Sequence, residues 1–230
     1  HSSSLSIPAV SSAVTVDGSL ADAFWSGGAI TLQDVFRNTD FPGLRANQAS
    51  TVKAGVQNDT LYLSFDNAEP NIAGMTVKQT QDGWAMFDDY VTVYVAYKSN
   101  PAEEIFPSKY VSFTVNGAGA KYATAFGQMT PDYNQAWYTH QRVIQPDAWQ
   151  AATQVDAANH KWTAEMAIPL AQLAATSADI NPDCLAINIV RHRPQSETST
   201  SSWAMVAGGD NADISQFSRW ALDWTPPSSA

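Results

Sequence analysis

Residues 51–66 read TVKAGVQNDTLYLSFD, and this stretch decides the fold. Apolar residues alternate with polar or small ones over 51–57 and again over 60–66, which is the pattern of strands with one buried face. Asn58-Asp59-Thr60 lies between the two halves and is rich in turn-forming residues. The stretch therefore predicts a β-hairpin. Because an isolated hairpin is only marginally stable in water, it predicts an antiparallel sheet with further strands.

The rest of the chain supplies those strands. Residues 110–126 and 149–168 each predict another hairpin, with turns at 116–119 and 157–159. YVTVYVAY, residues 90–97, is apolar or aromatic on both faces, as in a central strand that is covered on each side. Helix is expected only as a single turn near residues 20–25 and in LAQLAA. Further strands are expected at 29–36, 185–190, 202–206 and 217–224.

These patterns predict an all-β protein, an antiparallel β-sandwich formed by a single domain. The chain has 230 residues, a length that one large sandwich accommodates. We place the sandwich at residues 14–224, an N-terminal extension at 1–13 and the start of a linker at 225–230. The tryptophans expected in the core are Trp25, Trp162, Trp203 and Trp220.

The composition excludes several classes of partner. The formal net charge is -10, from 12 Lys+Arg against 22 Asp+Glu, and such a chain repels the phosphates of nucleic acids and of anionic membranes. No apolar run is long enough to predict a transmembrane helix. Cys184 is the only cysteine, so no internal disulfide forms.

The order of short motifs along the chain resembles that of the family 9 carbohydrate-binding modules. The motifs are VDGSLADAFW, TVKAGVQNDTLYLSFDNAEP, WAMFDDYVTVYV, KWTAEMAIPLAQL, LAINIVRHRP, SSWAMV and FSRWALD. The resemblance covers residues from about Val14 to Asp223. It implies a jelly-roll-like β-sandwich attached to a xylanase or another secreted polysaccharide-degrading enzyme of bacterial type.

The resemblance also implies a sugar clamp between two tryptophans, polar groups around it, and structural calcium. Trp84 matches the first clamp tryptophan, whereas DNADISQF, where the second is expected, contains none. Thr114 and Thr92 stand where such modules have an arginine and a glutamate. The family's clamp is therefore incomplete here, and the ligand is expected to differ.

Five residues are candidates for carbohydrate binding: Trp84, Trp137, Tyr133, Asn188 and Arg191. Aromatic rings bind sugars through the flat C–H face of a pyranose, while amides and charged groups bind its hydroxyls. Trp137 in PDYNQAWYTHQ is a candidate replacement for the missing clamp wall. Both tryptophans have an alternative interpretation, in which they pack against the sheet as ordinary structural residues. For Arg191, the alternative is a salt bridge within the protein.

Calcium requires six or more oxygen ligands, commonly carboxylates and backbone carbonyls. Asp66, Glu69, Asp88 and Asp89 lie at predicted strand ends near one edge and are the candidate ligands. Their alternative interpretation is as solvated loop acids and turn caps.

The sequence thus predicts a non-catalytic, secreted module that binds a polysaccharide such as xylan or cellulose, or an oligosaccharide, and targets an attached catalytic domain. Two alternatives remain open. One is a redox accessory domain, with copper held by His1 together with His140, His160 or His192, or with haem. The other is a sandwich that mediates only protein contacts. No hydrolase motif such as G-x-S-x-G or H-E-x-x-H is present.

Overall fold

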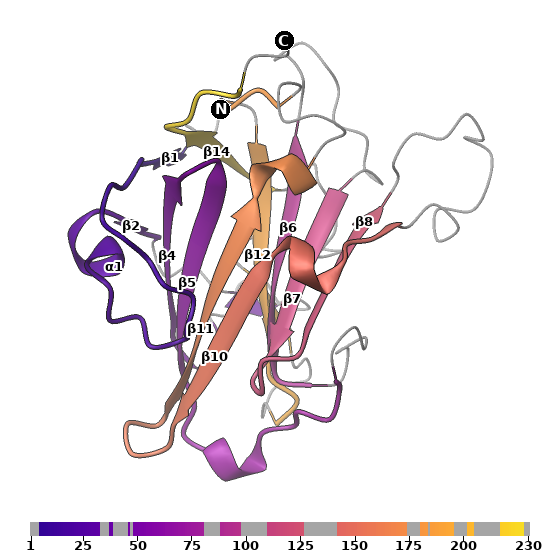
Figure 1. Ribbon diagram of the computed structural model, residues 1–230. Coiled ribbons are helices and arrows are strands. Elements are labelled where there is room, and N and C mark those ends of the chain that lie inside the picture. Colours follow the sequence, from indigo (N-terminus) through magenta and orange to yellow (C-terminus); the bar gives the residue numbers. More distant parts are fainter. Residues whose placement is uncertain are drawn as a thin grey trace, which may run out of the picture.

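The structure is a computed structural model, and it describes residues 5–32, 37–38, 46, 48–80, 88–97, 110–126, 142–173, 180–183, 185–195, 202–204 and 217–227. Two β-sheets lie face to face in it and enclose one main core (Figure 1). The predicted β-sandwich is therefore confirmed.

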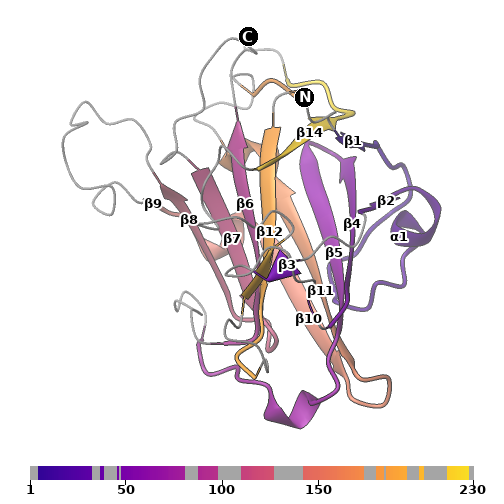
Figure 2. The same ribbon diagram turned by 180° about the vertical axis from the view of Figure 1, so that it is seen from behind.

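In the part of the chain that the structure describes, the larger sheet has nine strands. Its main path runs in the order β1-β14-β12-β6-β7-β8-β9, while β13 pairs with β12 and β3 pairs with β13 (Figure 2). All these pairs are antiparallel except β1 with β14, which is parallel. The strands are β1 (Leu5–Ile7), β3 (Arg37–Asn38), β6 (Tyr90–Tyr97), β7 (Tyr110–Asn116), β8 (Lys121–Phe126), β9 (Arg142–Val143), β12 (Leu185–His192), β13 (Ser202–Ala204) and β14 (Ser218–Leu222).

Among the described residues, the smaller sheet has five strands in the order β10-β11-β5-β4-β2, all antiparallel. The strands are β2 (Ile30–Thr31), β4 (Ser50–Gln57), β5 (Thr60–Ala68), β10 (Gln150–Asp156) and β11 (Lys161–Pro169). Two of the predicted hairpins, β4–β5 and β10–β11, thus form four adjacent strands of this sheet.

The turn of the β4–β5 hairpin shows why this stretch reverses so sharply. Gln57 pairs with Thr60, so only Asn58 and Asp59 form the loop. Both have positive φ angles, 51° and 58°, as a type I′ turn requires, and its twist matches that of the flanking strands. Asn and Asp tolerate this left-handed backbone conformation better than most residues. The predicted hairpin is confirmed.

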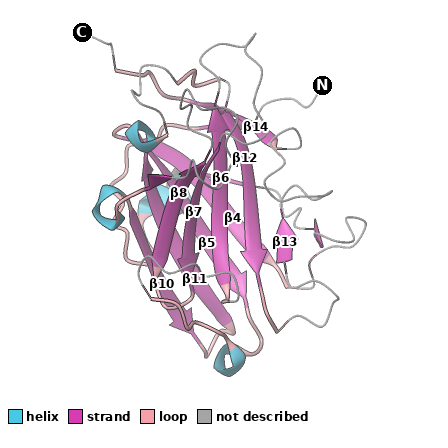
Figure 3. Cartoon of the chain, turned by 90° about the vertical axis from the view of Figure 1, so that its right-hand side faces the viewer, coloured by secondary structure: helices cyan, strands magenta, loops and turns pink. Residues whose placement is uncertain are grey.

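In the described residues, helix occurs only in short pieces, three at the ends or margins of the sandwich and one, α1, on the outer face of the five-stranded sheet (Figure 3). They are α1 (Ala23–Gly27) and the 3-10 turns η1 (Ile72–Gly74), η3 (Pro146–Ala148) and η4 (Leu170–Gln172). Within the described residues, the helix predicted in LAQLAA is only a 3-10 turn. Pro169, the last residue of the strand before it, has an extended backbone, so the turn begins only after this residue. The turn predicted near 20–25 starts later, after the N-cap residue Asp22.

The first described residues belong to the sheet and not to a separate extension. Leu5–Ile7 pairs with β14. The Val10 N–H donates to the Val56 carbonyl of β4, and the Val56 N–H donates to the Pro8 carbonyl. No helix in the described part of the chain is long and apolar enough to cross a membrane.

The core lies between the two sheets and includes the fully buried rings of Trp149, Trp162 and Trp220. The core positions predicted for Trp162 and Trp220 are confirmed. Trp25 is buried as well, but in a separate cluster with Val10 and Phe24. The prediction that Trp25 is a core residue is confirmed, but its cluster forms where α1 packs against the outer face of the five-stranded sheet near Tyr62, and not between the two sheets. The side chain of Trp203 lies outside the described residues.

Candidate functional site

Alternate residues of β6, β7, β8 and β12 point away from the core, onto the outer face of the nine-stranded sheet. Their neighbours Val93, Phe113, Ala123 and Ile189 fill the core, so the intervening side chains must face outward. Most of the outward side chains carry a hydroxyl or an amide. We call this surface the hydroxyl face and define it by Thr92, Tyr94, Ser112, Thr114, Tyr122, Thr124 and Asn188.

The strand register arranges this face in two rows. In one row Tyr122 lies opposite Thr114, and Thr114 lies opposite Thr92. The next row runs from Thr124 through Ser112 and Tyr94 to Asn188, again by direct opposition. No member of either row carries a charge at neutral pH. The face is therefore suited to ligand hydroxyls rather than to ions.

The first row contains a pair of hydrogen-bonded hydroxyls. Thr92 Oγ1 and Thr114 Oγ1 are 2.7 Å apart, in hydrogen-bond contact. Thr92 is buried, while Thr114, Tyr122, Tyr94 and Tyr110 keep part of their surface exposed. Among the described members of the face, the accessible part thus consists of Thr114 and the rings of Tyr122 and Tyr94, with Tyr110 beside them.

Two further features mark the second row. The ring of Tyr94 packs edge-on against Tyr110, with their centroids 5.6 Å apart. Thr124 Oγ1 is buried and has no hydrogen-bond partner among the described residues, although buried hydroxyls are normally satisfied. The Thr124 hydroxyl therefore has unused hydrogen-bonding capacity, but it is fully buried beneath the surface of the face.

The sequence candidates meet this face only in part. Asn188 lies on it, buried and opposite Tyr94. Trp84, Tyr133 and Trp137 fall outside the described residues, so their assignment to sugar binding stays a prediction.

Arg191 lies on the opposite side of the same strand. It is three residues from Asn188, and in a strand this odd spacing turns its side chain inward. Its guanidinium donates to the Ala68 carbonyl (2.7 Å) and to Ser50 Oγ (3.2 Å), which ties the two sheets together. Arg191 has no exposed surface, and burial lowers its pKa to about 10. This side chain therefore offers a sugar nothing to contact in this conformation, and the internal salt bridge considered for it is present.

Glu69 is the acidic partner at this end of the sandwich. Arg193 binds it through two hydrogen bonds, from Nε to Oε1 at 2.7 Å and from Nη2 to Oε2 at 2.9 Å, and Arg191 lies 3.6 Å away. Burial alone would raise the pKa of Glu69, but the hydrogen bonds and charge of Arg193 outweigh it and hold the pKa below its ordinary value. Glu69 is therefore a structural anion in a buried ion network.

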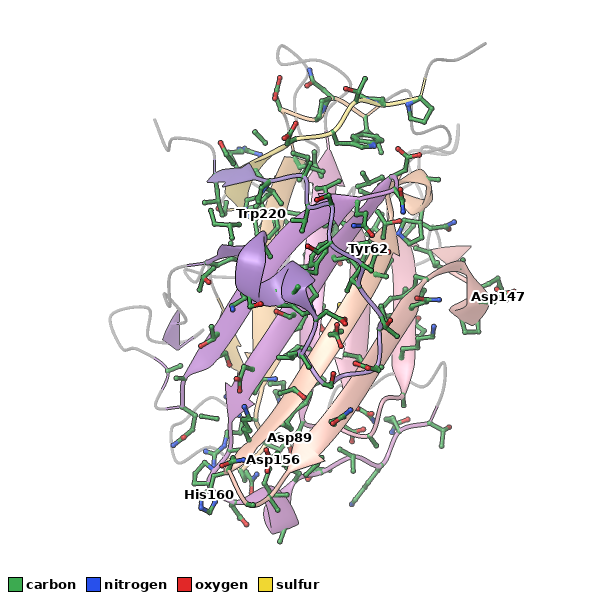
Figure 4. The ribbon with its side chains drawn as sticks, turned by 60° about the vertical axis from the view of Figure 1, so that its left-hand side comes forward. Tyr62, Asp89, Asp147, Asp156, His160 and Trp220 are labelled. Atoms are coloured by element: carbon green, nitrogen blue, oxygen red, sulfur yellow. The ribbon has the colours of Figure 1, made fainter. Side chains whose placement is uncertain are left out.

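Asp88 and Asp89 precede β6 and accept hydrogen bonds from residues 76–79. Asp88 Oδ2 accepts from the Gln79 N–H and from Asn116 Nδ2, and Asp89 Oδ2 accepts from the Thr76 N–H. Asp89 Oδ1 is buried with no hydrogen-bond partner among the described residues, and burial raises the pKa of Asp89 to about 6. Figure 4 shows Asp89 at the same end of the sandwich as Asp156 and His160, far from Trp220.

The four candidate calcium ligands do not form one cluster. Asp66 points to the outer face of the five-stranded sheet, where its carboxylate pairs with Lys161 at 3.3 Å. In the described part of the chain, no group of three or more His, Cys, Asp or Glu side chains is arranged to hold a metal ion. Of the candidate copper ligands, His192 is buried with Nδ1 2.6 Å from the Asp88 carbonyl, and burial lowers its pKa. His1 and His140 fall outside the described residues.

Sequence reasoning missed most of the hydroxyl face. The signal was present, because Thr92, Ser112, Thr114 and Thr124 occupy the polar positions of strands whose other positions are apolar. Strand alternation finds these residues, but it does not tell which strands are neighbours. Only the register brings the four hydroxyls together.

Comparisons with known proteins agree on this architecture. No family model matches the sequence, and no curated protein matches it significantly. Among solved structures, a family 9 carbohydrate-binding module from Caldicellulosiruptor kristjanssonii in complex with cellotriose covers 99% of this chain and 96% of its own, with TM-score 0.61 and 13% identity. This chain has the fold of a family 9 carbohydrate-binding module.

Two further structures extend the match. The C. kristjanssonii module in complex with glucose gives TM-score 0.59 at 13% identity, with 98% of each chain covered. A Bacteroides uniformis protein for which carbohydrate binding has been suggested gives TM-score 0.70 at 14% identity, covering 97% of this chain and 100% of its own. The shared fold extends over nearly the whole of each chain, so the family 9 module architecture describes this protein as one unit.

Proposed function

We propose that this protein is a non-catalytic carbohydrate-binding module with its sugar site on the hydroxyl face. One observation carries the proposal: an uncharged array of hydroxyls, bordered by tyrosines, covers a sheet of a fold whose relatives are in complex with glucose and cellotriose. Hydroxyl and amide groups exchange hydrogen bonds with sugar hydroxyls, and tyrosine rings pack against the C–H face of a pyranose. The ligand is therefore a neutral oligosaccharide or polysaccharide.

Trp84, Trp137 and Tyr133 are proposed to supply the remaining aromatic surface of this site. The rings of Tyr94 and Tyr110 pack edge-to-face against each other, so together they do not form a broad flat surface for a sugar ring. A flat indole next to them would complete a surface for one sugar ring.

The biological role that we propose is targeting. The module is attached to the catalytic domain of a secreted, bacterial polysaccharide-degrading enzyme, acting for example on xylan or cellulose, and holds that domain close to its substrate. Tethering raises the effective concentration of the enzyme at the polysaccharide without adding new chemistry.

Structural calcium remains a prediction, with Asp66, Glu69, Asp88 and Asp89 as the ligands first considered. Elemental analysis of the purified protein tests it directly. Calcium at one or more equivalents supports the prediction, whereas copper or a haem absorption band supports the redox alternative. Glu69 and Asp66 already have cationic partners, so a calcium site here would have to displace Arg193 or Lys161.

The test of sugar binding is isothermal titration with cellotriose, xylotriose and maltotriose. We expect Trp84→Ala to abolish the heat of binding while the far-UV circular dichroism spectrum stays unchanged. Trp224→Ala is the matched control, because Trp224 lies away from the hydroxyl face and bonds to Asp59 in the β4–β5 turn. Titration heats that are the same for the parent protein and for Trp84→Ala across the panel would contradict the assignment.

A further inference from the structure

A groove of about 360 Å³ lies on the outer face of the five-stranded sheet, on the layer opposite the hydroxyl face. Strands β4, β5, β10 and β11 form its floor. The segment from Ser19 to Trp25, which includes the start of α1, forms one wall and crosses in front of these strands (Figure 4). Its volume is within the usual range of small-molecule sites, at the lower end.

The floor of the groove is a regular polar array. Thr51, Asp66, Thr163 and Gln154 lie opposite one another across the four strands, in this order. Neighbouring strands are spaced by about 4.8 Å, so donors and acceptors repeat across the floor at that interval. Ser64, from the adjacent row, adds another hydroxyl.

The charges in the groove balance. Lys53 and Lys161 contribute positive charge, and Asp66 and Asp156 contribute negative charge. Lys161 and Asp66 form an ion pair whose side chains remain 35% and 40% exposed, so the pair gains little from its own contact and is open to ligand hydroxyls. The lining thus offers a charged ligand as many like charges as opposite ones. This balance favours a neutral ligand.

The wall is held in place by hydrogen bonds to the floor. Glu165 accepts from the Gly18 N–H at 2.8 Å and from Trp25 Nε1 at 2.8 Å, and Gln154 Nε2 donates to the Asp17 carbonyl at 3.1 Å. Gly18 has φ +82°, and a Cβ there would lie 2.7 Å from the Thr153 backbone, so only glycine allows this close approach. The groove is therefore preorganised and not formed by a loose arm.

We propose that this groove is a second binding site, for a short neutral ligand rich in hydroxyls, of the size of one or two sugar units. Each sugar hydroxyl both donates and accepts, and so matches a floor on which hydroxyl, carboxylate and amide groups alternate. Trp25 is only 3% exposed, so recognition rests on hydrogen bonds and not on stacking. The site is separate from the hydroxyl face and does not depend on sugar binding there.

The experiment is an NMR titration of the ¹⁵N-labelled protein with cellotriose, xylotriose and maltotriose. Groove amides from 51–66 and 154–163 are followed separately from hydroxyl-face amides at 92–94 and 112–124. Thr51→Arg fills the groove, and Val155→Arg places the same side chain at an exposed position of the same sheet, outside the lining. We expect at least one sugar to shift the groove amides, with affinity at least tenfold weaker in Thr51→Arg and unchanged in Val155→Arg.

Groove amides that move with none of the three sugars overturn this proposal. It is also overturned if Thr51→Arg and Val155→Arg bind equally, because the response then does not come from the groove. Should Thr51→Arg lose the dispersed spectrum of the folded protein, Gln154→Ala replaces it, with the same weakening expected. Loss of the hydroxyl-face response alone contradicts the proposed function and leaves this second site intact.

Discussion

The N-terminal wall of the groove depends on one buried carboxylate, and the substitution Glu165→Gln tests that dependence. Both carboxylate oxygens accept hydrogen bonds: Oε1 from the Gly18 N–H, with Asp17 N at 3.3 Å, and Oε2 from Trp25 Nε1. A glutamine has nearly the same shape but only one acceptor oxygen. Its amide group would therefore face either the indole N–H or the Gly18 N–H, donor against donor.

The expected loss follows from these contacts. A hydrogen bond to a charged group contributes about 1.5–3 kcal/mol, and a buried donor left unpaired costs about 1–3 kcal/mol. Removing the charge recovers part of this, because burial raises the pKa of Glu165 above its ordinary value. On balance we expect the free energy of unfolding to fall by about 2 kcal/mol.

A double-mutant cycle with Trp25→Phe isolates the indole bond. Phenylalanine keeps an aromatic ring but lacks the N–H, so a coupling energy of about 1–2 kcal/mol between the two positions is expected. Unfolding in urea is followed by far-UV circular dichroism, because removing Trp25 changes the fluorescence. Trp224→Phe is the matched control, since Trp224 Nε1 donates to Asp59 at 2.7 Å and not to Glu165.

The pH dependence gives an independent check. The folded pKa of Glu165 lies above the ordinary value of 4.5, so the folded state holds this proton more tightly than the unfolded state. The stabilisation that comes from binding this proton is fully present below pH 4.5 and declines as the pH rises through the folded pKa. Glutamine has no such loss, so the deficit of Glu165→Gln should be larger at pH 4 than at pH 7. This account of the wall would be refuted by two results together. The effects of Glu165→Gln and Trp25→Phe on the free energy of unfolding would add within about 0.5 kcal/mol, and the stability loss of Glu165→Gln would not change with pH.

Two further predictions concern the buried charges at the end of the sandwich. Arg193→Met leaves Glu69 buried without its bidentate partner. We expect urea unfolding to show a free energy of unfolding lower by about 3–5 kcal/mol near neutral pH. The difference should shrink as the pH falls below 4.5, because protonation of Glu69 then removes the same ion pair from the parent protein. The stability advantage of Asp89→Asn over the parent protein should grow between pH 4 and pH 8, by up to about 3 kcal/mol. The reason is that the parent protein loses stability as Asp89 ionises through its pKa of about 6. Thermal melts in EDTA measure this gain, and a gain that is absent or falls with pH contradicts it.

The sequence was sufficient for the fold wherever its signals were local. Two-residue periodicity and the Asn58-Asp59 turn predict the β4–β5 hairpin, and the same reasoning locates the β7–β8 and β10–β11 hairpins. The parallel pairing of Leu5–Ile7 with β14 joins opposite ends of the chain. No local pattern encodes such a contact, and these residues were accordingly assigned to an extension.

The candidate site was harder to predict because it depends on which strands become neighbours. Alternation alone places Asn188 and Arg191 on opposite faces of one strand, so grouping them in a single sugar site overlooked a signal that was available. The pairing of Arg193 with Glu69 joins β12 to the end of β5, strands of different sheets, and only the packing of the sheets reveals it. The same is true of Trp25, whose burial depends on α1 packing outside the sandwich.

The placement of four basic residues supports neutral ligands at the two proposed sites. Arg191 and Arg193 are buried and bound to Glu69 and to backbone carbonyls, so neither contributes charge to the hydroxyl face. In the groove, Lys53 and Lys161 are balanced by Asp66 and Asp156. The two surfaces lie on opposite layers of a sandwich whose sheets are spaced by about 10 Å, with a packed core between them. No described side chain belongs to both surfaces. A ligand bound to one surface should therefore not change the affinity of the other, and titration with a sugar that binds both should fit two independent sites.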